Sequence, residues 1–361
     1  MLITITKILL PATCGLGLAQ GLGWKQHLER GDRARAEHRF QEAEQEFRAA
    51  QAELRDASDA RMPSTLNRTA VALAGLFHYA EAEAAVREAL ALAAARDPTD
   101  LAVAPILQTM GSIYRRLGRH ADAEHCLRRL VTIEERQLGA LHVNVAEALH
   151  SLGIILQEEE KYSEAERAVR QALRIWEHVA PEKQADFAGG LSTLADIEMR
   201  RHRFKASASD HARALAMFEG LESPELVIVL ARFAFCSLAM KNYEQAESLS
   251  RRALTIAATS RERLVPNAAQ AELALAVAVA GQNRLKEADE HFAQALDIAG
   301  RVAGFQSVSY ARILESYAAY LITAKRPKEA AEIQSRVSAI LAPSKNVIGV
   351  TGLRSGDDRS K

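Results

Sequence analysis

Two histidines flanking a glutamate, His120, Glu124 and His125, come closest in this sequence to a catalytic metal site. A helical zinc site of the hydrolase type needs two histidines one turn apart, at i and i+4, with the glutamate as general base. Here the histidines stand at i and i+5, which places them about 140° apart around a helix of 3.6 residues per turn. The spacing therefore favours two surface histidines over zinc ligands.

Other patterns that would suggest catalysis are weaker. His142, Glu147 and His150 form a second possible metal group, but a connector separates His142 from the helix that carries the other two. The run "GLGLAQG" from Gly15 imitates a dinucleotide loop, yet its spacing is wrong and no strand precedes it. There is no phosphate loop, no Gly-x-Ser-x-Gly elbow and no paired-cysteine motif. The sequence predicts a protein that is not an enzyme and that uses no cofactor and no metal.

Composition places few limits on the partner. The chain has 361 residues, of which 48% are hydrophobic and 25% charged, as is ordinary for a globular protein. Lys and Arg number 46 and Asp and Glu number 46, so no basic excess favours nucleic acid. No small-molecule substrate is evident either. A protein or peptide partner of unknown identity is the expectation.

The first residues differ from the rest. Lys7 precedes an apolar run from Ile8 to Ala19 that ends in small residues, as secretory signal peptides do. Residues 1–19 are therefore interpreted as a signal peptide, which predicts a secreted or periplasmic protein. Pro11 and the single positive charge leave two alternatives open, an uncleaved membrane anchor or a disordered leader on a cytoplasmic protein.

A repeated helical pattern fills the remainder of the chain. The stretch "KYSEAERAVRQALRI" from Lys161 puts Ala165, Val169 and Ala172 on one helical edge. Seven other stretches align with it on the alanine of Glu164-Ala165. The aligned anchors are Ala43, Ala82, Ala123, Ala165, Ser207, Ala246, Ala288 and Ala330. Their steps of 39, 41, 42, 42, 39, 42 and 42 residues indicate a repeat array.

Each copy reads as a helix, a tight turn and a second helix. In the third copy a first helix from Leu107 ends at Gly118, before the helix that carries anchor Ala123. Gly111 and Gly153 recur at one position of the first helix. Small residues there and at the anchors would let the two helix backbones approach closely, while larger side chains fill the space between repeats.

These features resemble the tetratricopeptide repeat, with Leu152, Gly153, Tyr162, Ala165, Val169 and Ala172 in the positions that define that family. The period near 42 exceeds the usual 34 and resembles the kinesin light-chain type. The resemblance implies an all-α, right-handed superhelical solenoid of about eight repeats over residues 24–341. The fifth copy departs from the pattern at Ser207 and His211, and Pro327 opens the second helix of the atypical last copy. Residues 342–361 are expected to form a disordered polar tail.

Two cysteines, Cys126 and Cys236, lie in the third and sixth copies. A disulfide needs Cα atoms within about 7 Å, and several helices would separate these two. Both are interpreted as buried apolar residues without a bridge.

The resemblance also implies a binding surface, because the first helices of such repeats line a concave face. Counting the inward positions gives Gln108, Ser112, Arg115, Arg116, His150, Gln157, Asp196, Arg200, Phe235, Leu238, Leu273 and Val277. The first part of this set is polar and the last four residues are apolar. Arg115 and Arg116 could bind a carboxylate, or could simply be solvated. The apolar four could form a pocket, or could pack against neighbouring helices.

The function that follows is a binding scaffold that captures a segment of a protein partner in this groove. The Lys and Asn of the chaperone-binding carboxylate clamp are missing from the inward positions. The alternative is a structural part that self-associates, or joins a membrane-bound complex, through the apolar second half.

Overall fold

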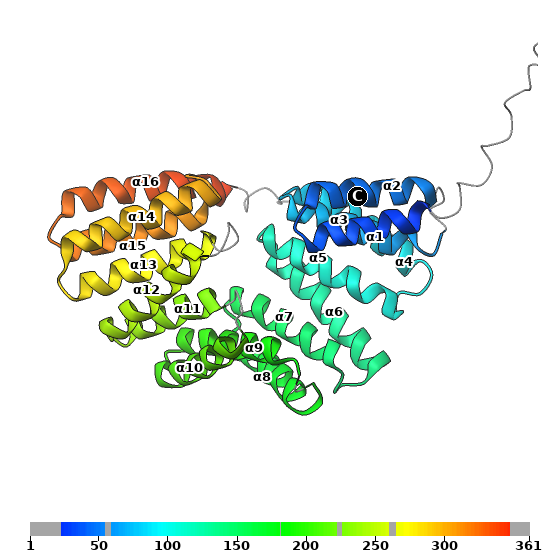
Figure 1. Ribbon diagram of the computed structural model, residues 1–361, viewed down its shortest axis with the longest axis horizontal. Helices are drawn as coiled ribbons and strands as arrows, with labels where there is room; N and C mark the ends of the chain where they lie inside the picture. The colour runs from blue at the N-terminus through cyan, green and yellow to red at the C-terminus, as the bar shows by residue number, and fades with distance from the viewer. Residues whose placement is uncertain (1–22, 55–58, 181, 222–225, 260–264, 347–361) are drawn as a thin grey trace, which may run out of the picture. The chain divides into compact units, whose positions relative to one another are not determined.

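The computed structural model describes residues 23–54, 59–180, 182–221, 226–259 and 265–346. These residues form sixteen α-helices, one short 3₁₀-helix and no strand (Figure 1). The α-helices, in order, are α1 (Gly23–Ala36), α2 (Phe40–Leu54), α3 (Met62–Gly75), α4 (Tyr79–Ala94), α5 (Ala104–Arg116), α6 (His120–Leu138), α7 (Val143–Glu158), α8 (Tyr162–Val179), α9 (Gln184–Arg200), α10 (Phe204–Leu221), α11 (Leu226–Ala239), α12 (Tyr243–Thr259), α13 (Val265–Gly281), α14 (Leu285–Ala303), α15 (Val308–Thr323) and α16 (Pro327–Asn346). The 3₁₀-helix, η1 (Leu101–Val103), precedes α5.

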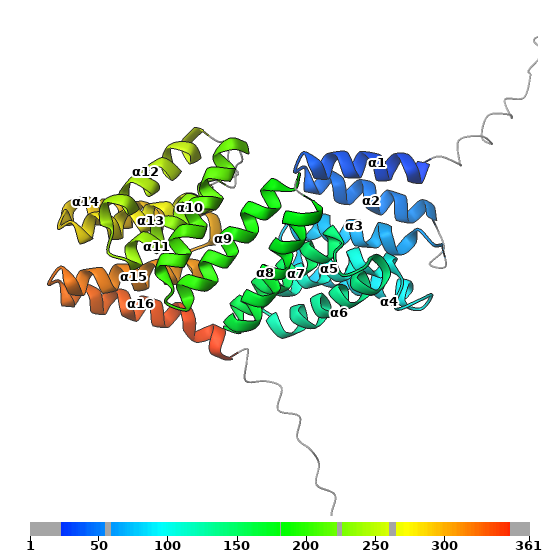
Figure 2. The same cartoon turned by 90° about the horizontal axis from the view of Figure 1, so that it is seen from below.

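The chain divides into two compact units, residues 1–175 and 176–361. The boundary falls inside α8, between Ile175 and Trp176. Within each unit the odd-numbered helix of a repeat packs against the even-numbered helix that follows it, and consecutive hairpins stack (Figures 1 and 2). The all-α repeat architecture expected from the sequence is confirmed.

One turn geometry joins the two helices of all eight repeats. The residue five positions before each anchor has a positive φ, from 59° at His202 and Lys241 to 72° at Gly118. The next amide donates a hydrogen bond of 2.8–3.0 Å back to a carbonyl five residues earlier, such as Arg119 N to Tyr114 O. This helix ending, in which one residue has the left-handed conformation, satisfies carbonyls that the first helix leaves free. Side chains of five types, as well as one glycine, occupy this position in the eight repeats.

Small residues bring the helices of a hairpin together. All eight anchors, Ser207 included, are 0–2% exposed. Twelve positions before the anchor the first helix carries only glycine or alanine. At Gly31, Gly111 and Gly153 this position faces the large side chain four positions after the anchor. A Cβ placed on Gly153 would lie 2.4 Å from Val169, and one on Gly31 2.5 Å from the ring of Phe47. The close approach predicted from the recurring glycines is thus present.

The departures noted in the fifth and last copies are accommodated differently. His211 is fully buried and stacks on Phe233, with the ring centroids 5.8 Å apart. Pro327 is the first residue of α16, where the missing amide hydrogen costs no helical hydrogen bond. Helix α16 continues through Asn346, five residues beyond the expected end of the repeats.

The proposed signal peptide, residues 1–19, lies outside the described residues, as does the tail from residue 347 onward. Among the helices of the described ranges, none combines the length and apolar character needed to cross a bilayer. Cys126 and Cys236 are both free and buried. Burial raises the pKa of the Cys126 thiol to about 11, which suits the apolar role expected for it.

Candidate functional site

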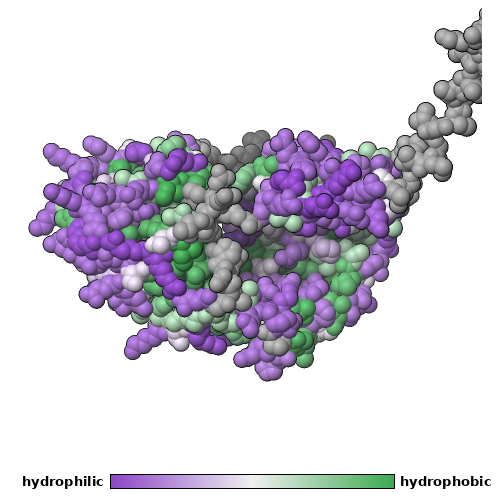
Figure 3. All heavy atoms as spheres, in the orientation of Figure 1, coloured by the Kyte–Doolittle hydropathy of each residue, from purple (hydrophilic) through white to green (hydrophobic). Residues whose placement is uncertain are grey.

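Within each unit, first helices of neighbouring repeats contact one another. Contacts join α3 to α5 in the first unit, and α9 to α11, α11 to α13 and α13 to α15 in the second. All twelve residues proposed for binding lie on first helices, namely α5 and α7 in the first unit and α9, α11 and α13 in the second, and each is exposed or half-buried. Figure 3 shows that hydrophilic residues dominate the face it draws, with smaller apolar areas between them.

Two of the polar candidates in the first unit already serve as links between repeats. Arg115 on α5 binds Glu158 on α7, with its Nε 2.8 Å from Oε1 and its second terminal nitrogen 2.7 Å from the same oxygen. Two turns nearer the start of α5, Gln108 donates a hydrogen bond of 3.0 Å to Ser151. A partner carboxylate would have to displace Glu158 to reach Arg115.

Ser112 and Arg116 instead face a cavity of about 290 Å³. Its other walls are Ala74 and Gly75 at the end of α3, Phe77 in the following turn, Tyr79 at the start of α4, and Ile113 on α5. The sequence-based set missed Phe77 and Tyr79, because it drew only on the first helices. A signal was present: the turn position of Phe77 carries polar residues or glycine in the other seven repeats.

The polar candidates of the second unit show a similar division. Asp196 on α9 lies 3.0 Å from Arg232 on α11 and 3.5 Å from the buried Nε2 of His211. This carboxylate on α9 thus contacts both α10 and α11. Arg200, one turn later on α9, is exposed.

The four apolar candidates are all half-buried but differ in their packing. Leu273 packs against both core clusters that span α13 to α16, and Val277 packs against one of them. Phe235 and Leu238 lie on α11 outside those two clusters. Phe235 and Leu238 are therefore the two apolar candidates that take no part in the α13–α16 core.

The histidines considered for metal chemistry have other positions. His142 accepts a hydrogen bond of 3.1 Å from the amide of Asn144 and so caps α7. His120 Nδ1 lies 3.3 Å from Glu158, whereas His125 is exposed. In the described ranges no three His, Cys, Asp or Glu side chains are placed to hold a metal ion.

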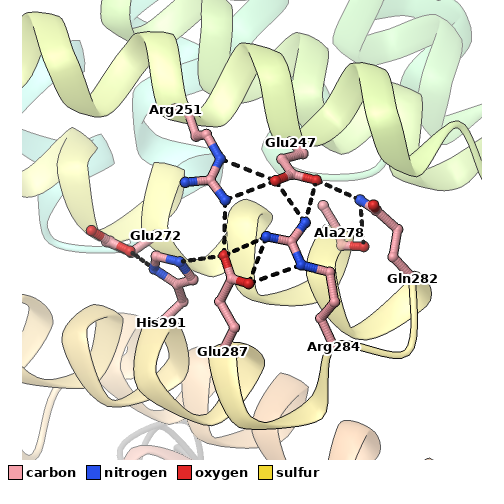
Figure 4. Close-up of polar contacts among 8 residues, drawn as sticks. All are labelled: Glu247, Arg251, Glu272, Ala278, Gln282, Arg284, Glu287 and His291. Carbon is pink, nitrogen blue, oxygen red and sulfur yellow. Dashed lines mark hydrogen bonds and ion pairs between the residues drawn. The ribbon is translucent and has the colours of Figure 1, made fainter.

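The second helices carry a recurring ionic arrangement, which we call the clasp. A basic residue four positions before one anchor pairs with the acid that follows the previous anchor, as Arg284 does with Glu247 at 2.8 Å (Figure 4). Arg251 and Glu287 complete the group, since Arg251 reaches both carboxylates and Glu287 also pairs with Arg284. Equivalent pairs are Arg119–Glu83, Lys161–Glu124 and Arg326–Asp289. These charges are used within the array and are not free for a ligand.

Burial and hydrogen bonding act in opposite directions on the clasp. Burial alone would raise the pKa of Glu247. The hydrogen bonds that its carboxylate accepts from Arg284, Gln282 and Arg251 outweigh that effect and lower the pKa of Glu247 to about 2. The carboxylate is therefore charged at neutral pH.

Stacked pairs of helices with small residues at fixed positions define an α-helical repeat protein of the solenoid class. Family models of the tetratricopeptide repeat match residues 100–178 and 273–308. Both ranges therefore carry tetratricopeptide repeats. A search of the curated proteins gives no significant match.

Several solved structures share the fold. The apo form of the quorum sensor NprR from B. thuringiensis is 12% identical, with 88% of this chain and 87% of that chain covered and a TM-score of 0.68. A Rap protein complexed with Competence and Sporulation Factor is 13% identical, with 90% of each chain covered and a TM-score of 0.63. A tetratricopeptide repeat protein from Parabacteroides merdae is 16% identical, covering 77% of this chain and 94% of that chain, with a TM-score of 0.55. At such identities the likeness concerns the fold alone.

Proposed function

We propose that this protein is a binding scaffold that captures a peptide segment of a partner protein on the faces of its first helices. The proposal rests on the side chains that remain accessible on those faces. The helix interfaces inside each repeat contain alanine and glycine at fixed positions, while first helices keep accessible side chains in both units. Arg116 on α5 is exposed in the first unit, and Arg200 on α9 with Phe235 and Leu238 on α11 are exposed or half-buried in the second. Preformed helices pay little ordering entropy when they bind, which favours capture of a flexible segment.

The similar structures support a binding role without identifying the ligand. One of them was solved in complex with Competence and Sporulation Factor, and another is named a quorum sensor. Helical repeats in general present extended surfaces on which a partner segment can lie. The chemistry of the ligand must come from the residues of this chain.

Export is a separate part of the proposal and rests on the sequence of residues 1–19. The apolar run from Ile8 to Ala19 supports cleavage near Ala19. Intact-mass measurement of the protein purified from its own cells tests this, because a species that begins at Met1 would contradict cleavage.

A peptide screen tests the main proposal. The full chain is incubated with a random peptide display library, and enriched sequences are synthesised and titrated. We expect saturable binding that weakens when the half-buried Phe235 is replaced in Phe235→Ala. Ser248→Ala, on the exposed side of α12, is the control. Absence of any saturable peptide, together with concentration-dependent dimerisation through the apolar residues, would instead favour the assembly role.

A further inference from the structure

The cavity between the α3–α4 turn and α5 has features that specify a ligand. We infer that it binds an extended peptide in which an acidic side chain and a large apolar side chain are two residues apart. Arg116 binds the carboxylate of this peptide, and Phe77 and Tyr79 contact its apolar side chain. This inference rests on the proposed peptide-binding function and adds the chemistry of one subsite.

Phe77 is an unusual residue to find exposed. Its side chain is 76% exposed, the highest value among the large apolar residues of the described ranges. Its backbone has φ of 64°, a left-handed conformation that bulky residues rarely adopt. The rings of Phe77 and Tyr79 form an edge-to-face pair, with the centroids 6.2 Å apart. An exposed aromatic ring held in this conformation at the mouth of a cavity contributes little to the fold and is available to a ligand.

Arg116 supplies the charge. Among the described residues it makes no ion pair and no hydrogen bond through its side chain, whereas its neighbours Arg115 and Arg119 are both paired. No acidic residue lines the cavity. The one ionised group at this site is therefore a guanidinium, which binds carboxylates with two parallel hydrogen bonds.

The size of the cavity sets the spacing of the ligand's side chains. A cavity of about 290 Å³ is roughly 8 Å across, too small for a folded partner element. In an extended chain, neighbouring side chains point to opposite sides, and residues i and i+2 lie on one side about 7 Å apart. An acidic residue and an apolar residue at i and i+2 can therefore reach Arg116 and Phe77 together, whereas the same pair at i and i+1 cannot.

The test uses capped, fluorescent heptapeptides with Glu-Gly-Phe at the centre, titrated against the full chain and followed by fluorescence anisotropy. The comparison peptides carry Gln-Gly-Phe, Glu-Phe-Gly or Lys-Gly-Phe in the same place. We expect the Glu-Gly-Phe peptide to bind about tenfold more tightly than the other three.

Two variants address the protein side. Arg116→Glu should lose binding of the Glu-Gly-Phe peptide and gain binding of the Lys-Gly-Phe peptide, a reversal that a folding defect cannot produce. Phe77→Gly should weaken binding about fivefold or more while leaving the turn unstrained, because glycine accepts a φ of 64°. Lys241→Gly makes the same backbone change in the sixth repeat and serves as the control.

Each outcome has one meaning. Equal binding of the Glu-Gly-Phe and Gln-Gly-Phe peptides, or no reversal with Arg116→Glu, would overturn the assignment of this cavity. If library peptides bind the chain but ignore Arg116→Glu and Phe77→Gly, the subsite fails while the scaffold function stands. If no peptide of any kind binds, the proposed function itself fails.

Discussion

In each repeat one turn residue has a backbone conformation that is strained for any residue except glycine. Seven of the eight turns place a residue other than glycine at a φ of 59–64°, and Gly118 occupies the eighth. For an L residue with a side chain this conformation costs roughly 1 kcal/mol relative to glycine. The hydrogen bond that closes each turn holds the conformation in spite of that cost. The stability of each repeat therefore depends on what stands at one turn residue.

This strain can be measured by exchanging the residue types. An added Cβ at Gly118 would meet nothing within 4 Å, so Gly118→Ala changes the backbone preference alone. We expect it to lower the free energy of unfolding by about 1 kcal/mol, and Lys241→Gly to raise it by about 0.5–1 kcal/mol. Denaturant unfolding measures both. Lys241→Ala, which keeps the strain, is the control, and a loss of stability in Lys241→Gly would contradict the argument.

Glu134 links stability to pH at a single carboxyl. It is 6% exposed on α6, and its Oε2 has no hydrogen-bond partner among the described residues. Burial, and next the negative charge of Glu147, raise the pKa of Glu134 to about 7, from an ordinary value of 4.5. The folded state thus holds a proton that the unfolded state releases. Its contribution to stability is complete below pH 4.5 and is lost as the pH rises through about 7.

Replacement of this carboxyl should remove the pH dependence. At pH 8 we expect Glu134→Gln to be more stable than the natural protein by roughly 2 kcal/mol, because the amide needs no ionisation in a dry site. Below pH 4.5 the two should unfold at nearly the same denaturant concentration. Glu135→Gln, at the neighbouring half-buried position, is the matched control. A difference between Glu134→Gln and the natural protein that stayed constant from pH 4 to pH 8 would contradict this account.

In two repeats a His–Glu pair joins the two helices of the hairpin, with the two residue types in reversed positions. In the first repeat, His27 on α1 contacts Glu46 on α2, with Nδ1 and Oε2 2.5 Å apart. In the seventh repeat, Glu272 on α13 contacts His291 on α14 at 2.7 Å, so the two residue types have changed places. The other six repeats have leucine at this position of the first helix. The hairpin thus tolerates a hydrogen-bonded pair where it usually buries apolar side chains, because the pair satisfies itself.

The clasp is a recurring polar connection between neighbouring second helices. Its side chains are partly exposed, so each pair contributes modestly and the group acts as a network. We expect a double-mutant cycle of Glu247→Ala and Arg284→Ala to give a favourable coupling at low salt, larger than that of an ordinary surface pair, which shrinks in 1 M NaCl. Because the pKa of Glu247 is lowered to about 2, this contribution is present above pH 4.5 and is lost as the pH falls toward 2.

An exposed pair on the same helix provides the comparison for the clasp. Arg301 and Asp297 are 66% and 60% exposed and join one turn of α14 only. The equivalent cycle on these two residues should give about 0.3 kcal/mol. Equal couplings for the two cycles would show that the clasp adds nothing beyond an ordinary surface pair.

The sequence was enough to predict the helices and their pairing into hairpins. It was not enough to predict the side-chain contacts between repeats. The anchors and the glycines of the first helices recur at a fixed period, and helical geometry turns that period directly into hairpins. The clasp joins charges that lie far apart in the sequence, such as Arg284 and Glu247 at a separation of 37 residues. A hydrophobic pattern read within one helix therefore does not reveal it. Aligning the charges of the copies would have shown it. The cavity depends on how far α5 lies from the turn at Phe77, which no spacing in the sequence sets.

Across the whole molecule, the fifth and sixth repeats depart from the others in two ways. Four positions after the anchor they bury His211 and Ser250, each 0% exposed, where most other repeats bury an apolar side chain. The polar atoms of both side chains lack hydrogen-bond partners within the described ranges. The clasp positions between these repeats hold Ala208 and Asn242, so the ion pair cannot form. In repeat arrays stability is roughly a sum of repeat and interface contributions, so opening should begin here.

Hydrogen exchange of the native protein can locate that weak region. We expect amides of α10 and α12 to exchange faster than their counterparts in α6 and α14, whose repeats carry Leu127 and Phe292 at the position of His211 and Ser250. Ser250→Ala removes a buried hydroxyl without a partner, and should slow exchange in α11 and α12 by an amount equivalent to about 1 kcal/mol. Ser248→Ala, an exposed change in the same helix, should alter exchange by less than about 0.5 kcal/mol. If α6 or α14 exchanged first, or if Ser250→Ala and Ser248→Ala behaved alike, the buried polar residues would not be the cause of local opening.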